Sequence, residues 1–165
     1  MIIMGIDPGF DRIGWAVGQL LGQHQLNLLS YGLVETNKKA DLFTRYAQIE
    51  REFNALTKEF QVDEAALETL VFFRNYTTVI PVAQARGIIL SSLIRHQVKI
   101  FEYSPPQIKM SVTGFGRADK AAVAKMVRLQ LHLDEQTKII DDTYDALAVL
   151  LTHLGSRGLQ QQTKV

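Results

Sequence analysis

The stretch Ile2-Ile3-Met4-Gly5-Ile6-Asp7-Pro8-Gly9 decides the fold of this chain. It is a short apolar run that ends on one aspartate and then breaks at Pro8-Gly9, which is the pattern of a buried strand followed by a turn. Asp7 would then stand where the strand leaves the sheet, the place where α/β sheets keep their ligands. Asp7 alone is equally well explained as a cap of this turn. The positions of the other acidic residues therefore decide between a ligand-binding role and a capping role.

The length and composition indicate an ordinary globular protein. A chain of 165 residues fits one domain, and we expect that domain over residues 1–154 and a flexible tail over 155–165. The absence of cysteine excludes disulfides and thiolate metal sites. No basic segment precedes the first apolar run, and no run is long enough to cross a bilayer, so we expect a cytoplasmic protein.

Charge is distributed unevenly along the chain. Residues 1–85 carry 7 Lys/Arg against 10 Asp/Glu, residues 86–138 carry 9 against 4, and the remainder carries 2 against 3. A basic middle section between acidic ends suits a polyanion held over a metal-binding site. Solvated helix faces explain the same charges, and on charge alone they are the simpler explanation.

The order of the expected elements predicts the architecture. Alternation and short apolar runs indicate strands near 2–7, 12–17, 25–34, 65–72 and 98–103. Helical periodicity and capping signals indicate helices near 41–60, 79–96, 105–112, 119–131 and 142–154. Three strands in a meander followed by βα units imply an α/β fold, a mixed five-stranded sheet with helices on both faces.

Four acidic residues belong to elements that such a sheet would bring together. Asp7 ends the first strand, Glu68 lies inside the apolar fourth strand, and Asp142 and Asp145 share one face at the start of the last helix. Helix capping explains an aspartate at 141 or 142, but it explains Asp145 poorly. If the last helix packs beside the first strand, Asp145 faces Asp7.

Convergence of these carboxylates predicts a metal centre. Two like charges ~4 Å apart cost roughly 4 kcal/mol at an effective dielectric near 20. Mg²⁺, with Mn²⁺ as an alternative, removes that cost and prefers carboxylate and water ligands. Two such ions per site form the clamp used for in-line phosphodiester cleavage, in which one activates water and the other stabilises the leaving 3′ oxygen.

Motifs spread along the chain carry a family resemblance. They are Met4–Gly9, Ala66–Glu68, Gln84–Gly87, Phe101–Tyr103, Gln107–Lys109, Gly114–Lys120 and Asp142–Ala148. In this order and spacing, and over nearly the whole chain to about Leu154, the sequence resembles the RuvC family of Holliday-junction resolvases. Each motif alone is weak, whereas the set is specific.

The resemblance implies an RNase H-like fold and a homodimeric Mg²⁺-dependent endodeoxyribonuclease. Such an enzyme cuts a four-way DNA junction by paired nicks that leave 5′-phosphate and 3′-hydroxyl ends. The resemblance also implies a branch-migration motor complex as a further partner. By position, the four acids would be metal ligands. Lys109 would act on the scissile phosphate and Lys120 on flanking backbone, although plain solvent exposure is the alternative for either lysine.

Further DNA contacts follow from the same resemblance. Some family members place a phenylalanine three residues after the second-motif glutamate, where it stacks on junction bases. This chain has Val71 there, and Phe72 and Phe73 follow, so either ring could stack on a base or belong to the core or a dimer interface. Arg74, beside them, and Arg117, in the basic stretch, are the remaining candidates for DNA contact.

Other functions remain open at this level. An RNase H-like nuclease acting on another branched or hybrid nucleic acid would look much the same. An actin-like phosphate-binding ATPase also opens with an aspartate turn after its first strand, but needs two such domains. A non-catalytic junction-binding protein would have lost one of the four acids. The histidines indicate no site, and His153, at i+8 from Asp145, is too far away to join the acids directly.

Overall fold

The computed structural model describes residues 1–22, 25–70, 76–134 and 138–162. Within them the strands are β1 (Ile2–Asp7), β2 (Arg12–Leu21), β3 (Gln25–Glu35), β4 (Glu64–Glu68) and β5 (Lys99–Tyr103). The helices are α1 (Leu42–Phe60), α2 (Tyr76–Arg95), α3 (Pro105–Thr113), α4 (Lys120–Gln130) and α5 (Asp141–Gln162). Each expected element is present, with bounds that differ most for β4 and α5.

The strands form one sheet in the order β3-β2-β1-β4-β5. The first three strands pair antiparallel as a meander, and β1, β4 and β5 pair in parallel. The strand β1 therefore lies at the centre of a mixed sheet, with β2 on one side and β4 on the other. The predicted α/β architecture, a mixed five-stranded sheet, is confirmed.

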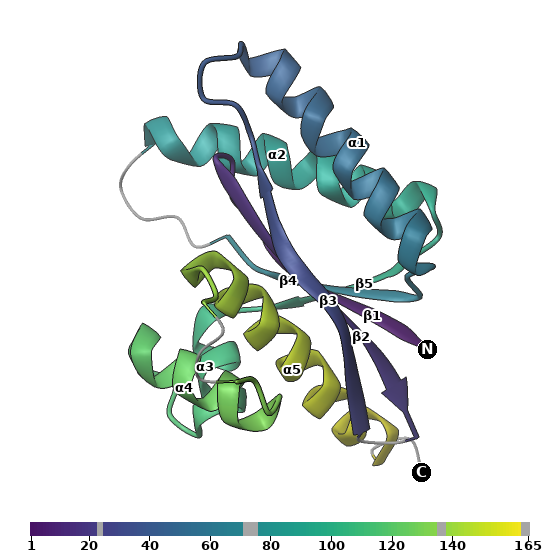
Figure 1. Cartoon of the computed structure of the whole chain (residues 1–165), viewed down its shortest axis with the longest axis vertical. Helices are drawn as coiled ribbons and strands as arrows, with labels where there is room; N and C mark the ends of the chain where they lie inside the picture. The colour runs from purple at the N-terminus through teal and green to yellow at the C-terminus, as the bar shows by residue number, and fades with distance from the viewer. Residues whose placement is uncertain (23–24, 71–75, 135–137, 163–165) are drawn as a thin grey trace.

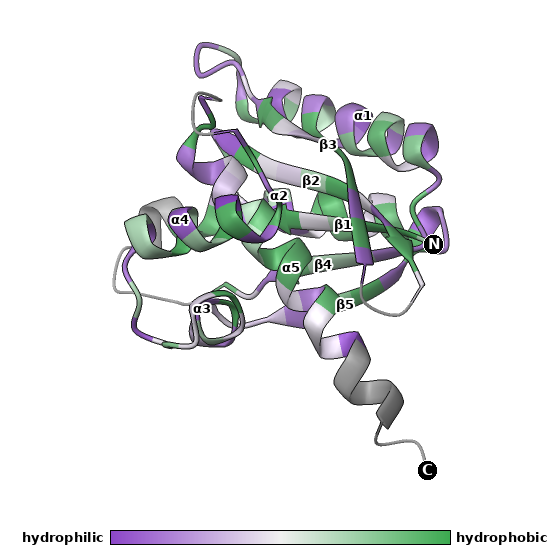
Figure 2. Ribbon diagram, turned by 60° about the horizontal axis from the view of Figure 1, so that its bottom comes forward, coloured by the Kyte–Doolittle hydropathy of each residue, from purple (hydrophilic) through white to green (hydrophobic). Residues whose placement is uncertain are grey.

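Helices cover both faces of the sheet (Figure 1). One face carries α1 and α2, and the other carries α5, with α3 and α4 packed against α5. Side chains of β1 alternate between the two layers: Met4 and Ile6 belong to the core under α1 and α2, whereas Ile3 belongs to the core under α5. In Figure 2 the central strands are largely apolar, as expected for strands buried on both faces.

Local signals explain the helix bounds. Asp41 caps α1 by accepting hydrogen bonds from the backbone N–H groups of Phe43 and Thr44, both at 3.0 Å. Asp119 caps α4 through the N–H of Ala122 at 2.8 Å. These two helix starts were correctly predicted from the sequence.

Three expected element ends are wrong. The strand β2 continues to Leu21, beyond the expected end near residue 17. The strand β4 ends at Glu68, so this glutamate closes the strand and does not lie within it. The helix α5 begins at Asp141 and continues to Gln162, beyond the expected end near Leu154. The glycines at 155 and 158 are poor helix formers, but a tertiary contact supports the extension, because Arg157 pairs with the buried Glu64 at 2.8 Å.

Among the described residues, no helix has the length and apolarity needed to cross a membrane.

Candidate metal and nucleic-acid site

The position of Asp7 follows from strand alternation. Gly5 and Asp7 point to the α5 side of the sheet, opposite to Met4 and Ile6. Asp7 is the last residue of β1 and pairs with Gly14 of β2. Its carboxylate is thus held at the carboxyl end of the central strand, below the first turns of α5.

Glu68 reaches the same point from the neighbouring strand. Ile6 of β1 pairs with Leu67 of β4 in a parallel register, so Glu68, the next residue, ends β4 beside the end of β1. Leu67 faces the core under α1 and α2, whereas Ala66 faces the core under α5. Glu68 therefore shares the α5 side with Asp7.

The close approach of α5 to the sheet supplies the other two carboxylates. A Cβ at Gly5 would overlap the carbonyl oxygen of Ala146, and a Cβ at Gly14 would overlap that of Asp142. Only glycine permits the helix to lie this close to β1 and β2. Asp142 and Asp145, three residues apart on one helix face, are consequently held against the strand ends.

The four carboxylates line one pocket of about 360 Å³. The remaining lining residues come from α3 and α4; they are Pro105, Ile108, Lys109, Lys120 and Val123. The structure thus brings together six of the residues singled out from the sequence, from five separate elements. A long distance between Asp7 and Glu68 or Asp145 would have ruled out a shared site.

Mutual repulsion and burial perturb the carboxylates. Burial, and then the negative charges of Asp145, Glu68 and Asp142, raise the pKa of Asp7 to about 8. Burial also raises the pKa of Glu68 and of Asp145, and the negative charge of Asp145 adds to the effect at Glu68. Without a cation, the protein holds Asp7 as a neutral acid over much of the physiological range.

Basic side chains partly offset this negative charge. The Nζ atom of Lys120 lies 3.2 Å from Oδ2 of Asp145, and the charges of Lys120 and Lys109 oppose the upward shift of the Glu68 pKa. The Nη1 atom of Arg12 lies 4.0 Å from Oδ2 of Asp142. Arg12 was not predicted as a site residue; the only sequence signal for it is its position just after the Asp-Pro-Gly turn.

The donor set fits a hard divalent cation. All four acidic groups offer carboxylate oxygens, and burial, followed by the charges of the neighbouring acids, raises the pKa of Asp7. In the described part of the chain, however, no three Asp, Glu or His side chains form a ready-made ligand group. Asp145 and Asp142 instead face Lys120 and Arg12, so closing a ligand shell would require these pairs to loosen.

The other predicted DNA contacts have different outcomes. Arg117 is exposed in the loop between α3 and α4 and does not line the pocket. Phe72, Phe73 and Arg74 lie outside the described residues, and their roles stay predictions.

A buried polar network that the sequence did not indicate lies elsewhere on α5. His153 is fully buried; its Nε2 lies 2.9 Å from Oε2 of Glu64, and its Nδ1 lies 2.8 Å from the hydroxyl of Tyr103. Arg157 completes the set by pairing with Glu64. These residues brace α5 against the start of β4 and the end of β5, whereas Glu68 closes the far end of β4.

Comparison with known proteins decides the family. The family model described as "Crossover junction endodeoxyribonuclease RuvC" matches residues 3–153. A protein of that name from Petrotoga mobilis is 42% identical over 153 residues, 93% of each chain. The chain belongs to the RuvC family.

Solved RuvC structures agree with this assignment. The Thermus thermophilus RuvC structure has a TM-score of 0.85 at 30% identity, covering 99% of this chain and 98% of the other. A second structure, T. thermophilus RuvC in complex with Holliday junction substrate, has a TM-score of 0.86 at 31% identity and 95% coverage of both chains. The fold is therefore RNase H-like, as the resemblance implied.

Proposed function

We propose that this RuvC-family chain resolves four-way DNA junctions by paired, metal-dependent nicks. The observation that carries the proposal is the convergence of Asp7, Glu68, Asp142 and Asp145 in one pocket with Lys109 and Lys120. Membership of a family named for crossover junction endodeoxyribonucleases supports it, as does the similarity to an RuvC bound to a Holliday junction.

The four carboxylates would hold Mg²⁺ or Mn²⁺, two ions per active site. When bound, such ions supply an activated water and stabilise the charge that develops on the leaving 3′ oxygen. The protein supplies the placement: two strand ends fix Asp7 and Glu68, and one helix face fixes Asp142 and Asp145. Cleavage of this kind leaves 5′-phosphate and 3′-hydroxyl ends.

The two lysines would bind the DNA backbone. Lys109 on α3 and Lys120 at the start of α4 both line the pocket, where their positive charges can attract a phosphate into a site that otherwise repels it. Lysine acts here as a point charge. An arriving phosphate would compete with Asp145 for Lys120, which frees that carboxylate at the moment the substrate binds.

A homodimer would place two such sites on one junction. A two-fold axis matches the symmetry of the junction, so each subunit could cut one of two opposed strands. A branch-migration motor complex as a further partner, and a cytoplasmic location, stay predictions from the sequence.

The main alternative is the same chemistry on another branched or hybrid nucleic acid. A panel of four-way junction, flap, RNA–DNA hybrid and linear duplex, incubated with Mg²⁺, separates the two: we expect symmetric cuts in the junction at a rate far above the others. Equal cleavage of flaps or hybrids would favour the alternative. An actin-like ATPase is disfavoured, because residues 3–153 match the RuvC family model.

The carboxylate assignment has its own test. We expect Glu68→Gln to bind the junction normally in EDTA and to lose cleavage in Mg²⁺ by at least about a thousandfold. Glu59→Gln, which changes an exposed glutamate of α1, is the matched control and should cut at the normal rate. Normal cleavage by the Glu68 variant would refute the proposed site.

A further inference from the structure

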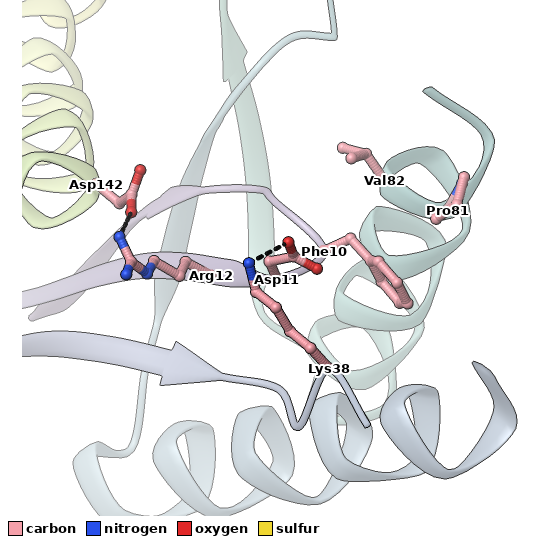
Figure 3. Close-up of a pocket in the computed structure, with 7 residues that line it drawn as sticks. All are labelled: Phe10, Asp11, Arg12, Lys38, Pro81, Val82 and Asp142. Atoms are coloured by element: carbon pink, nitrogen blue, oxygen red, sulfur yellow. Dashed lines mark ion pairs between the residues drawn. The ribbon is translucent and has the colours of Figure 1, made fainter. Parts of the chain in front are cut away.

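A second hollow, of about 560 Å³, lies beside the pocket of the four carboxylates, the proposed catalytic pocket, because Asp142 lines both. Figure 3 shows the residues that line the second hollow. Residues of the turn between β1 and β2 form its floor, Lys38 of the segment after β3 forms one rim, and Pro81 and Val82 of α2 form the facing wall.

Two cations share one acid at the polar rim of the hollow. The Oδ2 atom of Asp11 lies 2.8 Å from Nζ of Lys38, and its Oδ1 lies 2.5 Å from Nη2 of Arg45. Asp11 therefore keeps a cationic partner if Lys38 turns away from it. The Lys38 side chain is 69% exposed, so its ammonium can turn to an incoming anion while the buried Arg45 keeps Asp11 in place.

Arg12 stands at the junction of the two hollows. Its Nε lies 3.1 Å from Oε1 of Glu35, and its Nη1 lies 4.0 Å from Oδ2 of Asp142. The second distance is too long for a strong hydrogen bond, and guanidinium carries five donors. Arg12 therefore has donors left for a phosphate that lies in the second hollow.

The opposite wall is apolar. Pro81 and Val82 are half-buried and face the hollow across from the cationic rim (Figure 3). Phe10 lies at the base, with the guanidinium of Arg45 stacked 3.7 Å from its ring centroid and Tyr46 against it at 5.4 Å. These contacts hold the ring in place. An apolar wall opposite a cationic rim suits a nucleotide, which joins an apolar base to an anionic phosphate.

We propose that this hollow is a subsite for one nucleotide of the strand being cut, next to the scissile phosphate. The base would pack on Pro81 and Val82, and its phosphate would lie between Arg12 and Lys38. The strand would then run from the lysine side of the catalytic pocket, across the four carboxylates, into the hollow. This inference rests on the proposed function, because it needs a DNA strand in the catalytic pocket.

The base contact is tested by a thermodynamic cycle between protein and DNA. Four-way junctions carry a single abasic site, scanned across the nucleotides around the mapped cut, and their dissociation constants are measured in EDTA by fluorescence anisotropy. For the wild type we expect about tenfold weaker binding at one position. Val82→Trp, which fills the hollow, should bind the intact junction about tenfold more weakly and lose sensitivity to that abasic site.

Ile94→Trp is the matched control, because it adds the same side chain at an exposed position of the same helix. It should keep the wild-type abasic profile. If the two effects are simply additive in Val82→Trp, or if no position is sensitive in the wild type, the base does not occupy this hollow.

The phosphate contact is tested separately, with a variant that leaves the apolar wall intact. Lys38→Met should weaken junction binding about threefold and reduce the slope of log affinity against log salt by about one. Lys39→Met changes the next, equally exposed lysine and should reduce the slope less. Equal slopes for the two variants would overturn the assignment. Failure of the wild type to bind or cut junctions would instead overturn the proposed function.

Discussion

The ammonium of Lys120 lies 3.2 Å from the carboxylate of Asp145, so a lysine of α4 lies beside one of the four acidic groups that line one pocket. Both side chains are partly exposed to solvent, that of Lys120 by 71% and that of Asp145 by 26%. Surface ion pairs of this kind contribute little to stability. The role of this ion pair is electrostatic: the positive charge of Lys120 partly offsets the negative charge of the carboxylates.

Replacing this lysine should separate metal binding from catalysis. Lys120→Met removes a cation that competes for Asp145, so we expect Mn²⁺ affinity without DNA to rise severalfold, measured by electron paramagnetic resonance. Junction cleavage should fall by about tenfold or more, because a phosphate contact is lost. Lys125→Met, an exposed lysine farther along α4, should change neither quantity. Weaker Mn²⁺ binding by the Lys120 variant would contradict this account.

The pKa of Asp7 predicts an unusual pH dependence of stability. Folding raises this pKa from 3.8 to about 8, so the folded protein holds a proton that the unfolded chain releases. In metal-free buffer, the contribution of Asp7 to the free energy of unfolding is present below about pH 4 and is lost as the pH rises towards 8. Asp7→Asn should remove this dependence and melt a few degrees higher at pH 8 in thermal denaturation with EDTA.

Magnesium supplies the complementary measurement. Added Mg²⁺ should raise the melting temperature of the wild type at pH 8 and leave that of Asp7→Asn nearly unchanged, since a ligand that binds only the folded state stabilises it. The asparagine variant should also bind junctions and fail to cut them. An equal change in stability between pH 4 and pH 8 in the wild type and in Asp7→Asn would show that Asp7 is less perturbed than its burial implies.

The buried histidine of α5, His153, predicts a pH dependence of stability opposite to that of Asp7. Burial lowers the pKa of His153 below its ordinary value of 6.5, and the neutral ring donates to Glu64 from Nε2 while accepting from the Tyr103 hydroxyl. Its contribution to stability is therefore full above about pH 6.5 and falls as the pH drops below that value. Urea unfolding at several pH values from 5 to 8 measures it.

Truncating the same residue tests the network. His153→Ala should cost about 3–5 kcal/mol in the free energy of unfolding, because it leaves a cavity and unpaired buried groups. His96→Ala, at an exposed position where Nε2 meets Asn54 at 3.2 Å, should cost less than about 0.5 kcal/mol. Comparable losses in the two variants would mean that the buried network does not brace α5.

Two glycines offer a test of how the site is positioned. A Cβ at Gly14 would overlap the carbonyl oxygen of Asp142, whereas a Cβ at Gly87 of α2 meets nothing within 4 Å. Gly14→Ala should therefore displace the start of α5, lower stability by about 1–3 kcal/mol and slow cleavage by at least about tenfold. Gly87→Ala should stabilise the protein by about 0.5–1 kcal/mol. Chemical denaturation and junction cleavage assays check both.

Much of the site was predictable because its acids break local patterns. A carboxylate at the end of an apolar strand, as at Asp7, or before an apolar helical run, as at Asp145, is conspicuous in the sequence. Their meeting point followed from the expected order of the strands and the last helix. Among the residues that the structure describes, these acids do not by themselves form a group ready to hold a metal ion. A pattern of residue types could not reveal this.

What the sequence missed depends on contacts between distant residues. His153 and Glu64 are 89 positions apart, and neither lies in a motif that anticipates the other. The length of α5 was underestimated for the same reason, because propensity around Gly155 is poor and the Arg157–Glu64 pair compensates. Arg12 was not predicted because its distance to Asp142 depends on how closely α5 approaches β2. Gly14 permits that approach, and the sequence pattern does not show it.

The placement of two of the four acids on α5, the last helix, has a consequence for synthesis of the protein. A nascent polypeptide that has left the ribosome only as far as α4 already contains Asp7 and Glu68, but lacks the helix that brings Asp142 and Asp145 to them. The incomplete polypeptide would carry only two of the four carboxylates of the proposed metal site. The capacity to break DNA would thus arise late in translation, when α5 settles onto the finished sheet.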